Sequence, residues 1–482
     1  MSLKIDSNGK WTTGDGKVAP EGILIPGFVD AHCHILPTGL DLQKLHLGTC
    51  NSKEDVLDAV RSVLPNFAHG EWIHAVHYDQ TKFADATHLT RDDLDRVATD
   101  HPVLLRHSNG HASVANSVAL KSAGIPEDVE NPTGGEFVRD ASGRLTGVLL
   151  ERAHEFVTAA SPRPTTAEMT SAILVAAEKM SALGITCATD MMTGRWHLMD
   201  ELDAYQAAAE QGAKVRLRLC IQWATVFGPR VIGADALTER IKSMPRDICD
   251  VIGIKIFADG AIGSASAAIY GKYLTTGGDG QLIYAPERLK SMVQTAHDAG
   301  FRLAIHTIGD RSTDLVMDAY EATGDPSRHR IEHAMILSDE QIERIASLGC
   351  KVSMQPEFLK RFGHAYQKQL EAPVAKRIKR VKSVLDAGIP LSFSSDRPIV
   401  PGNPWDGIEV AVQRPEFFDQ SENVDLETAI RLYTKEGASA NYEAGTMGEI
   451  KEGAWADFQV YDSEPQPGTS PKAVFLAGLQ VQ

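Results

Sequence analysis

The run Gly27-Phe28-Val29-Asp30-Ala31-His32-Cys33-His34 decides how the rest of this 482-residue chain is interpreted. Residues 23–29 are largely apolar, which predicts a buried strand. Side chains on a strand alternate between its two faces, so His32 and His34 are expected to point the same way and Cys33 the other way. Two imidazoles that converge on one point suit a divalent metal ion. The alternative is that both histidines are solvated at a strand end. Other parts of the sequence are needed to distinguish a metal site from this alternative.

Short apolar, β-branched runs recur along the chain, and segments with helical periodicity lie between them, for example residues 166–183, 286–299, 339–348 and 374–387. Strands that alternate with helices predict a parallel sheet, and eight of them predict a closed (β/α)₈ TIM barrel. A doubly wound open sheet is the alternative, but no Gly-rich phosphate loop follows any run. The eight predicted strands are residues 28–34, 185–190, 215–221, 252–257, 303–306, 330–333, 352–355 and 391–396.

The gap between the first two predicted strands is too long for one βα connection. It contains strand-like runs of its own at residues 72–78 and 103–107. We therefore expect residues 50–160 to form an inserted subdomain over the active site, on the barrel face where active sites lie. Residues 27–49 and 161–439 would form the barrel, and residues 1–26 with 440–482 a small flanking β domain.

The composition excludes several classes of partner. Lys and Arg number 48 and Asp and Glu 64, which gives a net charge of −16 and argues against nucleic acid or an anionic membrane as partner. The basic run Lys376-Arg377-Ile378-Lys379-Arg380 is interpreted as one solvated helix face. The six cysteines are scattered without a CxxC pair, which is typical of reduced thiols in a cytoplasmic protein. The sequence contains no stretch of about 18 apolar residues, so it predicts no membrane span. The expected partner is a small-molecule substrate, and a homodimer stays open.

Residues that can bind a metal ion end several of the predicted strands. In a barrel, the C-terminal ends of all strands converge on one mouth, so residues far apart in the sequence would meet there. Four imidazoles, a carboxylate and a lysine suit Zn²⁺ or a similar divalent ion. Each residue alone has an ordinary interpretation, such as a core histidine or a surface ion pair, but their recurrence at strand ends favours a site. The set is His32, His34, Lys255, His306, His333 and Asp396.

At these residues the chain resembles the amidohydrolase superfamily of metal-dependent TIM-barrel hydrolases. Within it, the chain is most similar to the amidohydrolase 3 branch, which includes N-substituted formamide deformylase-like proteins. The resemblance covers nearly the whole chain from Gly22 onward, although relatives usually carry more β structure before the first strand. The motifs that carry it are the run 27–34, Gly110-His111-Ala112-Ser113-Val114-Ala115-Asn116, Gly147-Val148-Leu149-Leu150-Glu151, Lys255-Ile256-Phe257-Ala258-Asp259-Gly260, His306-Thr307-Ile308-Gly309-Asp310, Arg330-Ile331-Glu332-His333, Ser353-Met354-Gln355-Pro356, Ser394-Ser395-Asp396-Arg397-Pro398 and the terminal run 448–458.

The resemblance implies the family's metal and catalytic roles for the six residues of this set. It implies that CO₂ carboxylates Lys255 and that the carbamate bridges two cations, whereas a free amine would leave a single ion. Asp396 would be the general base, which takes a proton from the attacking water and later hands it to the leaving nitrogen. His111, Glu151 and Asp259 are candidates for substrate contacts. Their ordinary alternatives are a loop hydrogen bond, a helix cap and a turn.

The leading hypothesis is a metal-dependent hydrolase of a C–N bond other than a peptide bond, acting on a linear N-acyl or N-formyl amide. One or two Zn²⁺ ions would polarise the carbonyl and lower the pKa of a water molecule. A metal-dependent decarboxylase or isomerase on the same barrel is the first alternative. A non-catalytic binding relative is the second, and the acid–base candidate Asp396 argues against it.

Overall fold

The computed structural model describes residues 3–108, 112–132, 135–229 and 231–482. The chain divides into two units, Met1–Gly39 with Thr166–Gln482 and Leu40–Thr165. That these units act as domains, with the boundaries expected from the sequence, stays a prediction. Within the described ranges, no helix is both long and apolar enough to cross a membrane.

A sheet of eight parallel strands forms the centre of the larger unit, and its strand order follows the chain from first to last. The first and last strands are joined beyond the ladder by two backbone hydrogen bonds, from Asp396 N to His32 O (2.7 Å) and from His34 N to Arg397 O (2.8 Å). The predicted TIM barrel is therefore confirmed, and every predicted strand lies in it. The strands are β5 (Phe28–Cys33), β12 (Ile185–Thr193), β13 (Arg216–Gln222), β14 (Cys249–Phe257), β15 (Leu303–Thr307), β16 (Arg330–His333), β17 (Lys351–Met354) and β18 (Leu391–Phe393).

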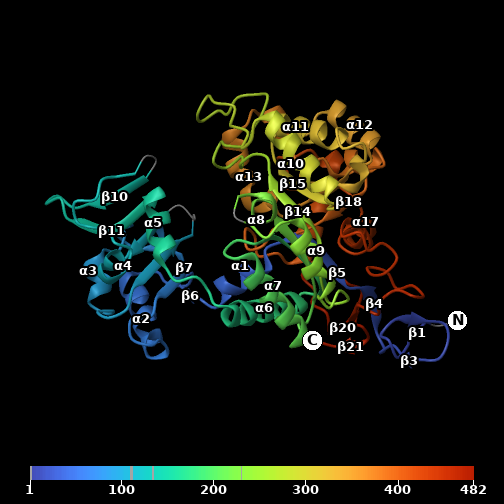
Figure 1. Cartoon of the computed structure of the whole chain (residues 1–482), viewed down its shortest axis with the longest axis horizontal. Coiled ribbons are helices and arrows are strands. Elements are labelled where there is room, and N and C mark those ends of the chain that lie inside the picture. The colour runs from blue at the N-terminus through green and yellow to red at the C-terminus, as the bar shows by residue number, and fades with distance from the viewer. Residues whose placement is uncertain (1–2, 109–111, 133–134, 230) are drawn as a thin grey trace. The chain divides into compact units, whose positions relative to one another are not determined.

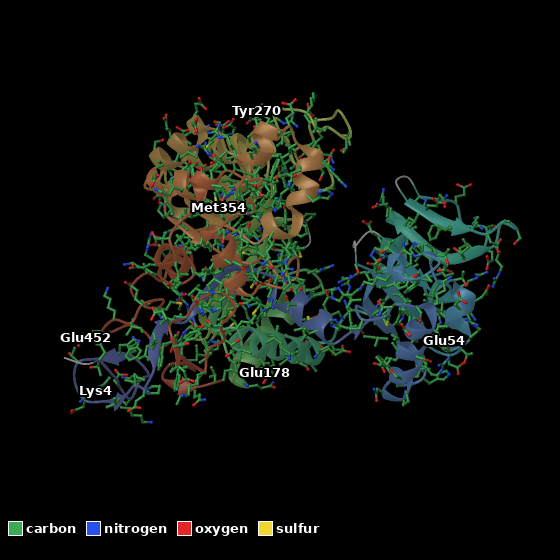
Figure 2. All side chains as sticks on the ribbon, turned by 180° about the vertical axis from the view of Figure 1, so that it is seen from behind. Lys4, Glu54, Glu178, Tyr270, Met354 and Glu452 are labelled. Atoms are coloured by element: carbon green, nitrogen blue, oxygen red, sulfur yellow. The ribbon has the colours of Figure 1, made fainter. Side chains whose placement is uncertain are left out.

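Side chains fill the interior of this barrel, as in any barrel of eight strands. All six residues of β5 are buried, and Met354 at the end of β17 is fully buried, whereas Tyr270 on the segment after β14 is 62% exposed (Figure 2). Helices connect the strands, and Gly184, at φ 83°, makes the turn from a helix into β12 that the sequence predicts. The helices are α1 (Ile35–Leu42), α6 (Thr166–Ser181), α7 (Leu198–Glu210), α8 (Trp223–Phe227), α9 (Ala234–Lys242), α10 (Pro286–Asp298), α11 (Asp310–Glu321), α12 (Asp339–Leu348), α13 (Phe358–Gln369), α14 (Ala372–Lys376), α15 (Val381–Asp386), α16 (Pro404–Val412), α17 (Leu426–Leu432) and α18 (Lys435–Ala440).

The predicted strand at residues 23–29 is in fact two strands in two sheets. Ile23–Pro26 (β4) pairs with a C-terminal strand, and the chain then enters the barrel at Phe28. Gly27 lies at the change of sheet, where a Cβ atom would lie 2.1 Å from the Thr186 hydroxyl, so only glycine fits.

Two small sheets from the chain ends flank the barrel. The first strand, β1, and the C-terminal end of the chain lie at these sheets (Figure 1). Trp11 packs on Phe458, with ring centroids 5.0 Å apart, and both belong to one apolar cluster. The first sheet is β1 (Lys4–Ile5), β2 (Trp11–Thr12) and β3 (Lys17–Val18), and the second joins β4 to β19 (Phe458–Tyr461), β20 (Ala473–Leu476) and β21 (Leu479–Gln480).

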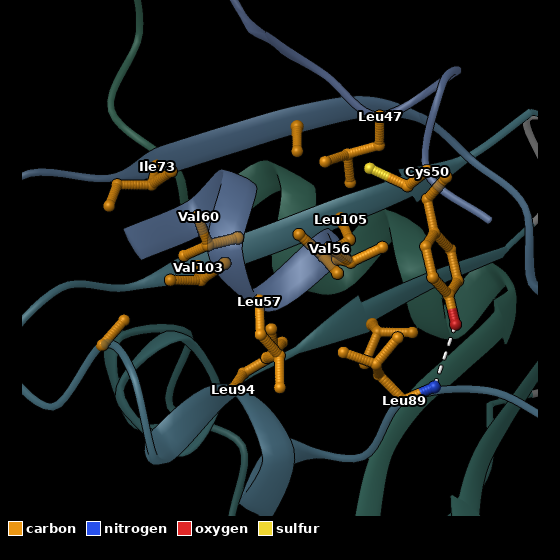
Figure 3. Close-up of a cluster of buried hydrophobic side chains, with 14 of the residues drawn as sticks. Leu47, Cys50, Val56, Leu57, Val60, Ile73, Leu89, Leu94, Val103 and Leu105 are labelled. Atoms are coloured by element: carbon orange, nitrogen blue, oxygen red, sulfur yellow. Dashed lines mark hydrogen bonds between the residues drawn. The ribbon is translucent and has the colours of Figure 1, made fainter. Parts of the chain in front are cut away.

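The unit Leu40–Thr165 is built on a mixed sheet of six strands, which includes both runs predicted as strands. Its core is apolar and includes Val56, Ile73, Val103 and Leu105 (Figure 3). The buried Tyr78 hydroxyl accepts a hydrogen bond from Leu89 N at 2.9 Å. The strands are β6 (Leu45–His46), β7 (Ile73–Tyr78), β8 (Val103–His107), β9 (Ala112–Ala115), β10 (Gly135–Arg139) and β11 (Leu145–Glu151), and the helices are α2 (Lys53–Val63), α3 (Arg91–Asp95), α4 (Ser117–Ser122) and α5 (Arg152–Ala160).

Candidate metal centre

Three of the predicted metal ligands meet where β5 and β18 end. His34 Nε2 lies 2.9 Å and His32 Nε2 3.5 Å from Asp396 Oδ1. One ligand atom from each residue lies within 4.8 Å of the other two, and all three residues are buried. The alternation expected along residues 32–34 therefore places both imidazoles on the same carboxylate.

A carboxylate on another strand fixes the orientation of His32. Its Nδ1 lies 2.6 Å from Glu332 Oε2, which can only accept, so Nδ1 carries the proton and Nε2 keeps its lone pair. Arg330 in turn donates from Nε to the other oxygen of Glu332. Burial acts to raise the pKa of Glu332, but Arg330 and His32 outweigh it and hold the pKa at about 2. Burial, with the charge of Lys255, lowers the pKa of His32 to about 4, so this imidazole is neutral at neutral pH.

The backbone around Asp396 is held in a sparsely populated conformation. Asp396 has φ 62°, which costs on the order of 1–3 kcal/mol in a non-glycine residue. Asp30 on β5 accepts from Ser395 N at 2.9 Å and from the Ser395 hydroxyl at 2.5 Å, which anchors this turn to the first strand. Although burial raises the pKa of Asp396, the neighbouring His32, His34 and Lys255 bring it below the usual value. The carboxylate is thus ionised and able to accept a proton.

Lys255 lies on β14 with its amine inside the barrel. The residue is 2% exposed, and Nζ has no hydrogen-bond partner within the described residues. Burial lowers the pKa of Lys255 to about 8, although the charges of Glu332 and Asp396 act to raise it. The amine lies 4.8 Å from the centre of the Phe257 ring, but a buried amine without a hydrogen-bond partner is costly, so a bound group would have a favourable contact to make here.

His306 lies near the end of β15 and His333 lies at the end of β16, and these two residues complete the set of four imidazoles. The His333 ring lies 4.5 Å from the His306 ring and 4.7 Å from the His32 ring, measured between centroids. His306 Nε2 lies 3.0 Å from Gly260 O, and burial lowers the pKa of His306 to about 3. His333, at φ 71°, has its Nδ1 2.7 Å from Gln355 Oε1. The four histidines therefore share one buried site with Asp396 and Lys255.

The three predicted substrate contacts have separate surroundings. The Asp259 carboxylate accepts hydrogen bonds from the backbone of Ala268, Ile308 and Gly309 and from the Ser312 hydroxyl, and the residue is 1% exposed. Four donors occupy its oxygens, so Asp259 would act on substrate through the loop that it anchors. Glu151 ends β11 in the other unit. His111 lies outside the described residues. All three roles stay predictions.

The predicted helix at residues 374–387, with its solvated basic face, is wrong in its central part. The chain forms α14 and α15 instead, and Lys379 between them is fully buried with φ 55°. Arg414 donates to the carbonyl oxygens of Ile378 (2.6 Å) and Lys379 (2.7 Å), which a continuous helix would have used itself. The Lys379 amine points inward and lies 2.7 Å from Gln355 Oε1.

Sequence reasoning missed Glu332, Gln355 and Lys379 as parts of this site. A signal exists for Glu332, because Arg330 and Glu332 occupy alternate positions of a buried strand and opposite charges inside a barrel have to be paired. Gln355 and Lys379 carry no such pattern, since their partners come from distant segments of the chain.

The donor set fits a divalent cation. It combines imidazoles with an ionised carboxylate, the ligands that Zn²⁺ prefers. His34 Nδ1 and Lys255 Nζ are buried polar atoms without a hydrogen-bond partner in the described part of the chain. His32, His34 and Asp396 would hold one ion, and His306 and His333 lie close enough to contribute to the same centre.

Comparisons with known proteins agree with this arrangement. The profile described as the Amidohydrolase family matches residues 19–474. The protein YtcJ of Bacillus subtilis (strain 168) is 30% identical over 463 residues, which cover 92% of this chain and 84% of that protein. The N-substituted formamide deformylase of Arthrobacter pascens is 29% identical over 462 residues, with the same two shares. The crystal structure of an uncharacterized metal-dependent hydrolase from Pyrococcus furiosus superposes with a TM-score of 0.79 at 26% identity, over 95% of this chain and 94% of that one.

Proposed function

This chain belongs to the amidohydrolase family, and we propose that it hydrolyses the C–N bond of a linear N-acyl or N-formyl amide with the help of a bound divalent metal, most simply Zn²⁺. One observation carries the proposal. The ligand atoms of His32, His34 and Asp396 gather within 4.8 Å, and the buried amine of Lys255 has no hydrogen-bond partner among the described residues.

Each residue of the site would have its own role in such a reaction. The bound cation would polarise the substrate carbonyl and lower the pKa of a water molecule. His32 and His34 would hold the ion, and Glu332 keeps His32 in the tautomer that can do so. Asp396 accepts the proton of the attacking water and returns it to the leaving nitrogen, a task suited to a carboxylate that is ionised at neutral pH.

Carboxylation of Lys255 would give the centre its second ion. Carbamate formation requires the unprotonated amine, and burial moves the pKa of Lys255 to about 8, in the direction that favours it. The carbamate would turn a buried amine into an anion able to help hold a second cation, to which His306 and His333 would contribute. Carboxylation would suit a position at which Lys255 Nζ has no hydrogen-bond partner among the described residues.

The surroundings of the histidines favour an apolar group on the substrate. The ring of Phe257 lies 5.2 Å from that of His306, and the ring of Phe358 stacks 6.4 Å from that of His333. An N-substituted formamide is one amide with such a group, and one relative is named for that activity. We place the reaction in the cytoplasm, since all six cysteines are buried free thiols.

An amide panel tests this proposal. Protein stripped with a chelator and reloaded with Zn²⁺ is incubated with N-formyl and longer N-acyl derivatives of apolar amines, and amine and formate are quantified separately. We expect amine release only with metal, formate release from the N-formyl members, and neither from Asp396→Asn. Asp386→Asn, which changes an exposed carboxylate paired with Lys382, is the matched control and should keep full activity. Absence of amine from every member, or CO₂ release from carboxylated analogues instead, would overturn the proposal.

A further inference from the structure

Lys379 is a buried lysine beside the site, and the proposed reaction does not use it. Its side chain is fully buried, and Nζ lies 2.7 Å from Gln355 Oε1 and 3.3 Å from the backbone oxygen of His333. The ring of Phe358 lies 5.3 Å from the same amine. Lysine side chains are rarely fully buried, and this residue also has φ 55°. A contribution to solubility therefore does not account for Lys379.

One amide oxygen joins this lysine to a metal-binding histidine. Gln355 Oε1 faces both the Lys379 amine and His333 Nδ1, each at 2.7 Å. At its other end, Gln355 Nε2 donates to the Ser394 hydroxyl at 3.0 Å and to the Ser353 backbone oxygen at 3.5 Å. The amide therefore has partners at both ends, with Lys379 and His333 on its oxygen.

Two contacts decide which way this amide points: the Lys379 amine lies 2.7 Å from Oε1 and the Ser353 backbone oxygen lies 3.5 Å from Nε2, so the lysine makes the shorter one. The Ser394 hydroxyl can donate or accept, and an imidazole nitrogen can do either according to its tautomer, so neither fixes the amide. Lys379 donates to both carbonyl oxygens that it meets, Gln355 Oε1 and His333 O. If the amide were reversed, its NH₂ group would face the lysine amine, and the hydrogen bond from Nζ to Oε1 would be lost.

We propose that Lys379 is a positioning residue that acts through Gln355 to set the tautomer of His333. With Gln355 Oε1 held toward it, His333 must carry its proton on Nδ1, and Nε2 keeps the lone pair that binds a cation. Glu332 does the same for His32 directly, because a carboxylate cannot donate. A neutral amide can donate or accept, so the orientation of Gln355 depends on its partners, of which Lys379 makes the shorter fixed contact. The inference rests on the proposed function only in taking His333 as a metal ligand.

The decisive experiment compares Lys379→Met with the double variant Lys379→Met/Gln355→Glu. Zn²⁺ affinity of the chelator-stripped protein is measured by competition with a chromophoric chelator, so turnover plays no part. Lys379→Met should weaken binding roughly 10- to 100-fold, the usual effect of losing a partner behind a metal-binding histidine. The double variant should recover to within about threefold of the parent, because the new carboxylate only accepts and restores the tautomer without the lysine. Lys351→Met, at the opposite end of β17, is the control and should bind as the parent does.

Unchanged affinity in Lys379→Met overturns the proposal, and so does a double variant as weak as the single one, since a merely structural lysine would not be rescued at position 355. If the variants do not fold, ¹⁵N-histidine NMR of the metal-free parent decides, with His333→Gln used to assign the signal. A proton on Nδ1 supports the inference, and a proton on Nε2 contradicts it. An inactive amide panel with intact Zn²⁺ binding and rescue would refute the proposed substrate and leave this role for Lys379 standing.

Discussion

His32 Nδ1 and Glu332 Oε2 lie 2.6 Å apart, although 300 residues separate them in the sequence. The contact joins the first strand of the barrel to the sixth and directs His32 Nε2 toward Asp396. Glu332 also forms an ion pair with Arg330, so the carboxylate that orients the His32 imidazole is itself fixed in position.

Glu332→Gln should therefore lower Zn²⁺ affinity roughly 10- to 100-fold, since an amide can turn its NH₂ toward His32 and release the tautomer. Binding is measured on chelator-stripped protein. Glu443→Gln removes the carboxylate that pairs with the buried Arg218 elsewhere in the barrel unit, and so controls for the loss of an ion pair. Equal losses in both variants would mean that the effect is one of stability and not of orientation.

Asp396→Asn should retain metal but lose turnover roughly 10²–10⁴-fold, because the amide has a similar shape and cannot accept the proton. Metal content by elemental analysis and kcat on the best substrate of the panel check the two halves separately. Turnover at the parent rate would remove Asp396 from the role of base.

Lys255→Ala should lose metal and activity together, because the bridging anion goes with the side chain. Short carboxylic acids that fit the vacated space should restore part of both. Lys255→Arg should not respond to them, since guanidinium stays cationic and fills the space. Parent levels of metal and turnover in the alanine variant would show that no carbamate is required.

Acid should destabilise the metal-free protein through His329, a buried residue that directly precedes β16. Burial, with the charge of His297, lowers the pKa of His329 from 6.5 to about 3. The stabilising contribution of a neutral histidine of this kind is complete above pH 6.5 and is lost as the pH falls toward 3. Between pH 8 and pH 5 the loss should reach about 2 kcal/mol of unfolding free energy.

The check is the urea midpoint of the metal-free protein at both pH values. His329→Asn keeps an acceptor for Leu303 N, which lies 3.1 Å from His329 Nδ1, and should show a smaller decrease between the two pH values than the parent. An equal decrease in the two proteins would assign the acid sensitivity to other groups.

The barrel and its six metal-site candidates could be predicted because both rest on local patterns. Strand alternation brings His32 and His34 to one side, and parallel topology brings strand ends such as His306 and Asp396 to one mouth. Neither inference needs to know which side chains touch.

What could not be predicted depends on contacts between distant segments. The basic run at 376–380 has the composition of a solvated helix. In the structure, however, Arg414 donates hydrogen bonds to two of its carbonyl oxygens, and the Lys379 amine donates to Gln355 Oε1. The change of sheet at Gly27 likewise depends on the position of Thr186. Such facts follow from packing, which a single sequence does not show.

The most direct measurement is a Zn²⁺ titration of chelator-stripped protein by calorimetry near neutral pH. The parent should bind Zn²⁺ in a defined stoichiometry, and His34→Ala should weaken that binding at least about tenfold, because it removes a ligand of the cluster of His32, His34 and Asp396. His364→Ala, at an exposed position on α13, should bind as the parent does. A parent that takes up no Zn²⁺, or a His34→Ala variant that binds as well as the parent, would contradict a metal centre at this site.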